Sequence, residues 1–133
     1  MEIYSDASSD DNIAGLGWVI VLDSGEEISA NTFLQGEYTS MQAEYFGVLY
    51  ALRHAKKEST SHVDIYVDCE PLIEKMRVPD GKSEDWYKRR RGCHRLLNKF
   101  DSWELVWIPR SCNSDADRLA YEALEEGRNS IEQ

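Results

Sequence analysis

Residues 1–34, MEIYSDASSDDNIAGLGWVIVLDSGEEISANTFL, decide the fold because they contain three strand-like segments in quick succession. The segments 1–7, 13–22 and 26–34 are rich in apolar and β-branched residues, which favour strands. Short polar turns separate them, with Asp23-Ser24-Gly25 between the second and the third. Consecutive strands joined by short turns pair antiparallel, so we expect a three-stranded meander.

Helices alternate with strands after residue 40, where the spacing of apolar residues becomes helical. In chain order we expect helix 40–57, strand 63–68, helix 70–76, helix 84–100, strand 103–108 and helix 114–126, the last ended by Gly127. The order β-β-β-α-β-α-α-β-α predicts an α/β fold with a five-stranded mixed sheet, three antiparallel strands followed by parallel ones, flanked by about four helices. Sites in such sheets form at the carboxyl ends of the parallel strands.

The length and composition fit a single domain, residues 1–133, with a core of about 1–127 and a short polar tail at 128–133. No apolar run approaches the roughly 20 residues that cross a membrane, and the first residues do not resemble a signal peptide. We therefore expect a soluble, cytoplasmic protein. The three cysteines are far apart and form no CxxC pair, which supports neither a disulfide framework nor a zinc site.

The net charge of −10, from 15 basic and 25 acidic residues, disfavours a nucleic-acid partner unless the cations gather in one place. On the predicted helix 84–100, four cations fall on one face at ~100° per residue, opposite an apolar face. This basic stripe consists of Lys88, Arg91, Arg95 and Lys99. It predicts a surface that follows phosphates, with an ordinary solvated helix face as the alternative.

Two predicted strands end in the same short phrase, Tyr4-Ser5-Asp6 and Tyr66-Val67-Asp68. In each phrase, Tyr and Asp lie on one side of the strand. If the two strands are parallel neighbours, the aspartates lie side by side at the strand spacing of roughly 5 Å. Two like charges so close repel and raise a pKa unless a cation joins them.

Two further acids, Glu44 and Asp117, are each open to two interpretations. Glu44 falls on the helix face expected to pack on the sheet, where a carboxylate is costly unless it is paired or metal-bound. Glu44 can instead be an acid in the first turn of a helix, where the helix dipole favours negative charge. For Asp117 taken alone, this second interpretation is the stronger one. Asp10 and Asp115 are interpreted as capping or surface residues.

The ordered set of motifs resembles the type 1 ribonuclease H family, particularly its compact archaeal and plant-type members. The resemblance spans residues 3 to about 124. Each motif alone is weak, but the whole set stands in the expected order. Its members are Asp6, the Gly-x-Gly-Trp-Val-Ile segment at 15–20, Thr39-Ser40-Met41-Gln42-Ala43-Glu44-Tyr45, Tyr66-Val67-Asp68 and the segment 113–120 with Asp117.

This resemblance implies a ribonuclease H-like fold and a catalytic, metal-binding tetrad of Asp6, Glu44, Asp68 and Asp117. The implied substrate is the RNA strand of an RNA–DNA hybrid, cut by an endonuclease to leave 5′-phosphate and 3′-hydroxyl ends. Two Mg²⁺ or Mn²⁺ ions per site are expected, because hard cations prefer oxygen ligands and a pair about 3.5–4 Å apart can activate water and stabilise the leaving oxygen. Asp6 is expected to bridge both ions, Glu44 and Asp68 to hold one, and Asp117 the other. We expect a monomer without an organic cofactor.

The chain departs from the family pattern in the loop before the last helix. Many bacterial relatives carry a histidine there, whereas residues 108–113 contain none. Arg110 is a candidate to contact a phosphate instead, and Gln42 to supply part of the minor-groove hydrogen bonds. The full set of candidate substrate-binding residues is Ser8, Gln42, Lys88, Arg91, Arg95, Arg110 and Asn113.

Three rival interpretations remain open. A 3′–5′ exonuclease normally shows Asp-x-Glu at the end of the first strand, whereas this chain has Asp6-Ala7-Ser8. A non-catalytic or weakly active nucleic-acid-binding module would keep the fold and lose an acid, yet all four are present. A small acidic interaction domain has only the net charge in its favour.

Overall fold

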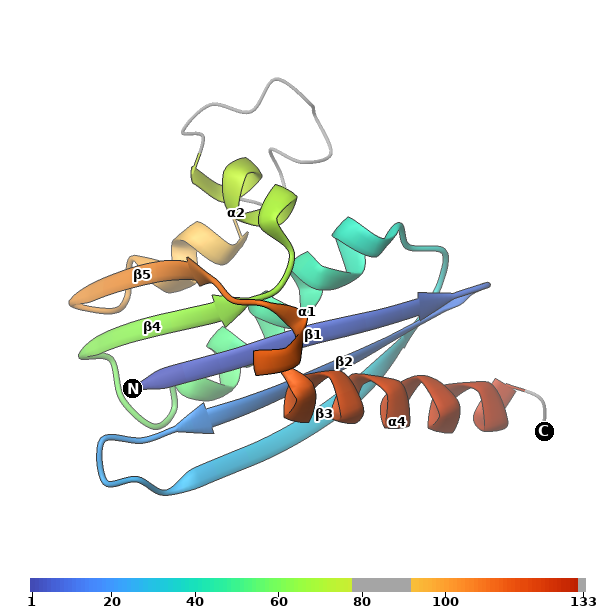
Figure 1. Ribbon diagram of the computed structural model, residues 1–133, viewed down its shortest axis with the longest axis horizontal. Helices are drawn as coiled ribbons and strands as arrows, with labels where there is room; N and C mark the ends of the chain where they lie inside the picture. The colour runs from blue at the N-terminus through green and yellow to red at the C-terminus, as the bar shows by residue number, and fades with distance from the viewer. Residues whose placement is uncertain (78–91, 132–133) are drawn as a thin grey trace.

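The computed structural model describes residues 1–77 and 92–131 (Figure 1). The elements are β1 (Glu2–Asp10), β2 (Ile13–Val21), β3 (Glu27–Gln35), α1 (Ser40–Ala55), β4 (His62–Val67), α2 (Glu70–Arg77), a helical segment at 92–97, β5 (Ser102–Trp107), the 3₁₀ helix η1 (Arg110–Cys112) and α4 (Ser114–Ile131). The strands form one sheet in the order β3-β2-β1-β4-β5. Strands β1, β2 and β3 are antiparallel, and β4 and β5 run parallel to β1. The predicted mixed sheet of five strands is confirmed.

The register of β1 against β4 places the two Tyr-x-Asp phrases side by side. Tyr4 pairs with Tyr66, and their rings stack with centroids 4.9 Å apart. The prediction that the first strand ends near Asp6 is wrong, because β1 continues to Asp10. It continues because the hairpin partner β2 pairs with it as far as Asp10, while the ladder with β4 stops at Tyr4.

Helices α1 and α4 cover opposite faces of the sheet (Figure 1). Helix α1 begins with a capping box, in which Thr39 Oγ1 accepts from the Gln42 N–H and Gln42 Oε1 accepts from the Thr39 N–H. Its buried side packs on apolar side chains of β1, β2 and β4 to form the main core. The largest fully buried members of this core include Ile3, Leu16, Ile20, Val48, Leu52, Val63 and Ile65.

Helix α4 lies directly on β2 because two glycines leave room for its backbone. A Cβ at Gly15 would be 2.1 Å from the Ala120 carbonyl oxygen, and a Cβ at Gly17 would be 2.4 Å from the Ala120 nitrogen. The predicted end of this helix at Gly127 is wrong, since α4 runs to Ile131 and residues 128–131 are no tail. Gly127 serves packing instead, because a Cβ there would be 2.0 Å from Ile13 Cδ1.

The predicted long helix at 84–100 falls partly outside the described residues, as do its members Lys88 and Arg91. Its described part is helical over 92–97, and the chain turns at 98–99 before β5. Cys93, Leu96 and Leu97 are buried, whereas Arg95 and Lys99 are exposed. Within the described ranges, no helix combines the length and the apolar character that a membrane-spanning helix needs.

Candidate metal centre

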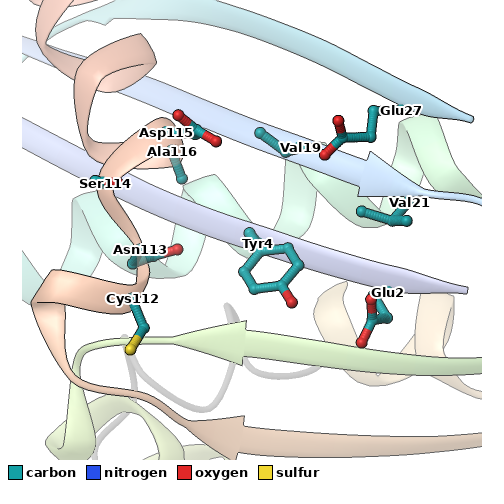
Figure 2. Close-up of a pocket in the computed structure, with 10 residues that line it drawn as sticks. All are labelled: Glu2, Tyr4, Val19, Val21, Glu27, Cys112, Asn113, Ser114, Asp115 and Ala116. Atoms are coloured by element: carbon teal, nitrogen blue, oxygen red, sulfur yellow. The ribbon is translucent and has the colours of Figure 1, made fainter. Parts of the chain in front are cut away.

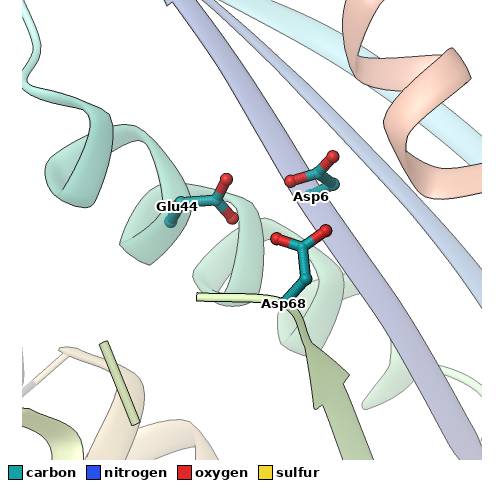
Figure 3. A group of neighbouring side chains, drawn as sticks. All are labelled: Asp6, Glu44 and Asp68. Carbon is teal, nitrogen blue, oxygen red and sulfur yellow. The ribbon is translucent and has the colours of Figure 1, made fainter. Parts of the chain in front are cut away.

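Three carboxylates from three different elements converge at one edge of β1 (Figure 3). Asp6 lies on β1, Glu44 on α1, and Asp68 directly after β4. Each offers an oxygen atom, and these three oxygens lie within 4.8 Å of one another. Asp6 is 1% exposed and Glu44 is 8% exposed, so two of the three acids are buried. The sequence prediction that Asp6 and Asp68 lie side by side is confirmed, with Glu44 facing them.

The close approach of α1 to β1 is what brings Glu44 to Asp6. Gly47 lies one helical turn after Glu44 and packs on the strand. A Cβ at Gly47 would be 3.0 Å from Ser5 Oγ and 3.2 Å from the Asp6 carbonyl oxygen, tighter than ordinary contacts. The glycine therefore lets the helix backbone approach the strand, and Glu44 reaches the edge where β1 loses its pairing with β4.

The electrostatics of the cluster oppose full ionisation without a cation. Burial, together with the nearby Asp117 and Asp68 carboxylates, raises the pKa of Asp6 to about 7. Burial and the charge of Asp6 raise the pKa of Glu44 well above its ordinary value. The Ala7 N–H donates to Glu44 Oε1 at 3.3 Å. Both oxygens of Asp6, and Oε2 of Glu44, are buried without a hydrogen-bond donor in the described part of the chain.

Asp117 lies on α4, which covers the face of the sheet opposite to α1, the helix that carries Glu44. It lies exposed in the first turn of α4, and its N–H donates to the Asn113 carbonyl oxygen at 3.0 Å. Its carboxylate is close enough to Asp6 to help raise the pKa of that residue. It is not among the three acids whose oxygens lie within 4.8 Å of one another. The fourth predicted acid is therefore adjacent to the cluster and belongs to a separate layer of the fold.

Asn113 joins the cluster to the loop before α4. Its side chain is 1% exposed, and its Nδ2 donates to the Ser5 carbonyl oxygen at 2.9 Å and to Asp68 Oδ2 at 3.3 Å. Its Oδ1 is buried without a partner among the described residues. The amide therefore orients Asp68 and ties β1 to the start of α4. The sequence placed Asn113 among substrate ligands, and only the fold shows these contacts.

The remaining predicted substrate-binding residues are spread around the cluster. Ser8 is half-buried on β1 beyond Asp6, and Gln42 is half-buried in the first turn of α1, where its Oε1 belongs to the capping box. Arg110 is exposed in η1, and Arg95 is exposed on the helical segment 92–97. Lys88 and Arg91 lie outside the described residues. For all of these residues, contact with a substrate stays a prediction.

A pocket next to Asn113 was not predicted from the sequence (Figure 2). It is lined by Tyr4 and by acids from β1, β3 and α4, on the sheet face that carries α4. The signal was present in the sequence, because Glu2 and Tyr4 alternate with the buried Ile3 and share a strand face with Asp6.

The fold and the carboxylate cluster define a ribonuclease H-like protein. The sequence matches the family described as "Reverse transcriptase-like" over residues 4–123. The chain belongs to this family.

Relatives and solved structures agree with this assignment. The chain is 32% identical to ribonuclease HI of Halobacterium salinarum over 92% of its own length and 63% of that protein's, so it spans less than two thirds of this relative. The crystal structure of RNase H1 from Halobacterium salinarum superposes with a TM-score of 0.85 at 29% identity, covering 94% of this chain and 97% of that one. The N-terminal RNase H domain of a Mycobacterium tuberculosis protein, solved as a fusion, superposes with a TM-score of 0.84 at 25% identity, covering 98% of this chain and 96% of that one. LC11-RNase H1, solved in complex with an RNA/DNA hybrid, superposes with a TM-score of 0.77 at 23% identity, covering 95% of this chain and 97% of that one. At this identity the likeness supports the fold of this chain and no more.

Proposed function

We propose that this protein is a metal-dependent endoribonuclease that hydrolyses the RNA strand of RNA–DNA hybrids. The convergence of Asp6, Glu44 and Asp68 carries the proposal, because three acids so close together, two of them buried, are costly without a cation. The name of the Halobacterium relative and the hybrid bound to LC11-RNase H1 support the choice of substrate. The cytoplasmic location, the monomeric state and the lack of an organic cofactor stay predictions.

The donor set fits a hard divalent cation such as Mg²⁺ or Mn²⁺. All the candidate ligand atoms are carboxylate oxygens, which such ions prefer, and both oxygens of Asp6 and Oε2 of Glu44 lack a hydrogen-bond donor within the described ranges. We assign Asp6 to the centre of a two-ion site, with Glu44 and Asp68 on one side and Asp117 on the other. Bound there, the ions would activate the attacking water and stabilise the departing 3′ oxygen, giving 5′-phosphate and 3′-hydroxyl ends.

The residues of the chain itself hold the acids in place. The Asn113 amide fixes Asp68 through Oδ2, and the Ala7 N–H fixes Glu44 through Oε1, which leaves Glu44 Oε2 directed to the cluster. Burial on β1 and α1 restricts the rotamers of Asp6 and Glu44, so the oxygens are positioned before a ligand arrives. Exposed Arg95 and Arg110 are assigned to the phosphate backbone of the substrate, Gln42 to part of the minor-groove hydrogen bonds, and Ser8 to the substrate without a more specific role.

The test is a cleavage assay with end-labelled RNA–DNA hybrid, all-RNA duplex and all-DNA duplex, in Mg²⁺, in Mn²⁺ and in EDTA. We expect cleavage of the RNA strand of the hybrid with either metal and none in EDTA. Cleavage that persists in EDTA contradicts the metal site. Hybrid binding without cleavage in both metals identifies instead a non-catalytic binding module with the same fold.

A further inference from the structure

A pocket of about 380 Å³ opens beside the start of α4, on the same strand face as the carboxylate cluster but next to it along β1 (Figure 2). Its volume lies within the range of roughly 300–1,000 Å³ that is typical of small-ligand sites. Its lining includes neither Asp6 nor Glu44 nor Asp68. It is therefore distinct from the carboxylate cluster, and Asn113 connects the two through its hydrogen bond to Asp68.

The charged groups that line this pocket are all carboxylates. Glu2 is half-buried on β1, whereas Glu27 and Asp115 are exposed at the rim. None of the ten described residues that line the pocket is a lysine, arginine or histidine. A ligand here meets three carboxylates and no basic side chain of the lining, which favours a cationic donor.

Asn113 adds a buried acceptor that points to a ligand. Its Nδ2 donates to the Ser5 carbonyl oxygen and to Asp68 Oδ2, and both of these partners are acceptors. The opposite orientation of the amide would place an oxygen against these acceptors, so the assignment of the two atoms is secure. Oδ1 is left without a partner in the described part of the chain, and Figure 2 shows it directed into the pocket toward Tyr4. Buried acceptors are normally hydrogen-bonded, so Oδ1 is expected to accept from a donor on a ligand.

The floor of the pocket is aromatic and apolar. Tyr4 lines it and stacks on Tyr66 at 4.9 Å with an angle of 18° between the ring planes, and Val19 and Val21 complete it. The Tyr66 hydroxyl donates to Glu2 Oε2 at 3.3 Å, which holds that carboxylate beside the rings. A hydrated metal ion gains nothing from such a floor, whereas an organic cation contacts the rings and the methyl groups with its carbon atoms.

We propose that this pocket binds an organic cation, with an alkylammonium or guanidinium group donating to Asn113 Oδ1 and the rim carboxylates while its carbon chain lies on Tyr4 and the valines. The group can belong to a free polyamine or to a lysine or arginine side chain of a protein partner. The competing occupant is an anion at the positive N-terminal end of α4. Asp115 and Asp117 in the first turn of α4 offset that end and repel an anion.

The experiment is a titration of the ¹⁵N-labelled full chain, followed by NMR, with putrescine and separately with Nα-acetyl-lysine amide, in buffer containing physiological salt. We expect saturable shifts at the amides of Val19, Val21 and Asp115. Saturation by putrescine alone identifies a free polyamine as the ligand, and saturation by the blocked lysine as well identifies a side chain. The uncharged analogue 1,4-butanediol is expected to leave these amides unshifted.

Two variants separate this pocket from the general attraction of an acidic protein for cations. Glu27→Gln is expected to weaken putrescine binding about tenfold, because a charge-assisted hydrogen bond is removed. Glu58→Gln removes the same charge from an exposed position away from the pocket and is expected to leave the affinity unchanged.

Three results overturn the proposal. The first is the absence of saturable shifts with either cation, and the second is equal weakening by both variants. The third is a shift of the same amides by inorganic phosphate or MgCl₂ in preference to putrescine. The proposal does not depend on nuclease activity, so a protein that cleaves no hybrid can still confirm it.

Discussion

The carboxylate cluster and the neighbouring pocket both carry acids of β1, yet the two groups of acids are in opposite physical states. In the cluster, Asp6 and Glu44 are buried and their oxygens lie within 4.8 Å of each other and of Asp68. In the pocket, Glu27 and Asp115 are exposed and face an aromatic and apolar floor. The same kind of side chain therefore fits a hard metal ion in one place and an organic cation in the other, because desolvation and spacing differ.

Asn113 lies between these two regions and contacts both. Its amide hydrogens are used on the side of the cluster, and its oxygen faces the pocket. The Asn113 amide thus donates to Asp68 of the cluster, whereas its oxygen has no donor among the described residues.

The largest effect is expected for Asp6→Asn, which removes the central acid of the cluster. We expect hybrid cleavage to fall about a thousandfold, which corresponds to roughly 4 kcal/mol of lost transition-state stabilisation. The measurement is the single-turnover rate in Mg²⁺. Asp11→Asn, an exposed acid just beyond the end of the same strand, is the control and should keep the parental rate. A rate of Asp6→Asn within tenfold of the parent contradicts the assignment of the site.

A smaller effect is expected for Asn113→Ala, which removes the hydrogen bond to Asp68 Oδ2. Loss of a residue that orients a metal ligand typically lowers metal affinity or activity by roughly 10–100-fold. The Mn²⁺ affinity measured by calorimetry should fall in this range, and high Mn²⁺ should restore part of the cleavage rate. The exposed Asn98→Ala serves as control. Unchanged Mn²⁺ affinity would show that Asp68 is oriented without Asn113.

The pH dependence of stability distinguishes buried from exposed acids. The pKa of Asp6 rises from 3.8 to about 7 on folding, so its protonated form stabilises the metal-free protein fully below about pH 4. That stabilisation is lost as the pH rises through 7. We expect the free energy of unfolding without metal to fall between pH 4 and pH 8 relative to Asp6→Asn.

Urea unfolding at a series of pH values in EDTA measures this difference. Mg²⁺ should restore stability at pH 8 in the parent protein and have less effect on the variant, because metal binding requires the ionised acids. Glu27→Gln provides the contrast from the pocket and should follow the pH profile of the parent. Identical profiles for the parent and Asp6→Asn would contradict the raised pKa.

The basic stripe should attract the phosphates of a hybrid, in contrast to the acidic pocket. Arg95→Ala removes an exposed cation of the basic stripe, and we expect hybrid binding to weaken by a few-fold and the slope of log K against log salt to decrease by about 1. Fluorescence anisotropy at several salt concentrations gives both quantities, and Arg118→Ala, on the exposed side of α4, is the matched control. An unchanged slope in Arg95→Ala would identify residue 95 as part of an ordinary solvated face.

The smallest effect is expected at the pocket rim. Glu27→Gln removes one of several exposed like charges, so the free energy of unfolding should change by less than about 0.5 kcal/mol. Thermal melts in the absence of metal measure the change for both variants. At pH 8 the change caused by Asp6→Asn should be the larger of the two. A change at residue 27 equal to the one at residue 6 would erase the distinction between the two regions.

Much of the fold followed from patterns that depend on local sequence. Strand alternation and helical spacing predicted the mixed sheet and the order of elements along the chain, and the repeated Tyr-x-Asp phrase predicted that Asp6 and Asp68 lie together. Element ends were less predictable, because they depend on partners distant in sequence. β1 extends to Asp10 through pairing with β2, and α4 passes Gly127 because that glycine packs against Ile13.

The sequence by itself determined the class of fold, the family and the acids that form the cluster, because strand and helix periodicity and ordered motifs are properties of the chain read along its length. Only the tertiary structure decided that Gly47 lets Glu44 reach Asp6, that Asn113 faces inward, and that an acidic pocket with an aromatic floor lies beside the cluster. These features depend on how closely layers approach and on which atoms remain without partners. Such distances arise from packing between distant segments, which no local pattern encodes.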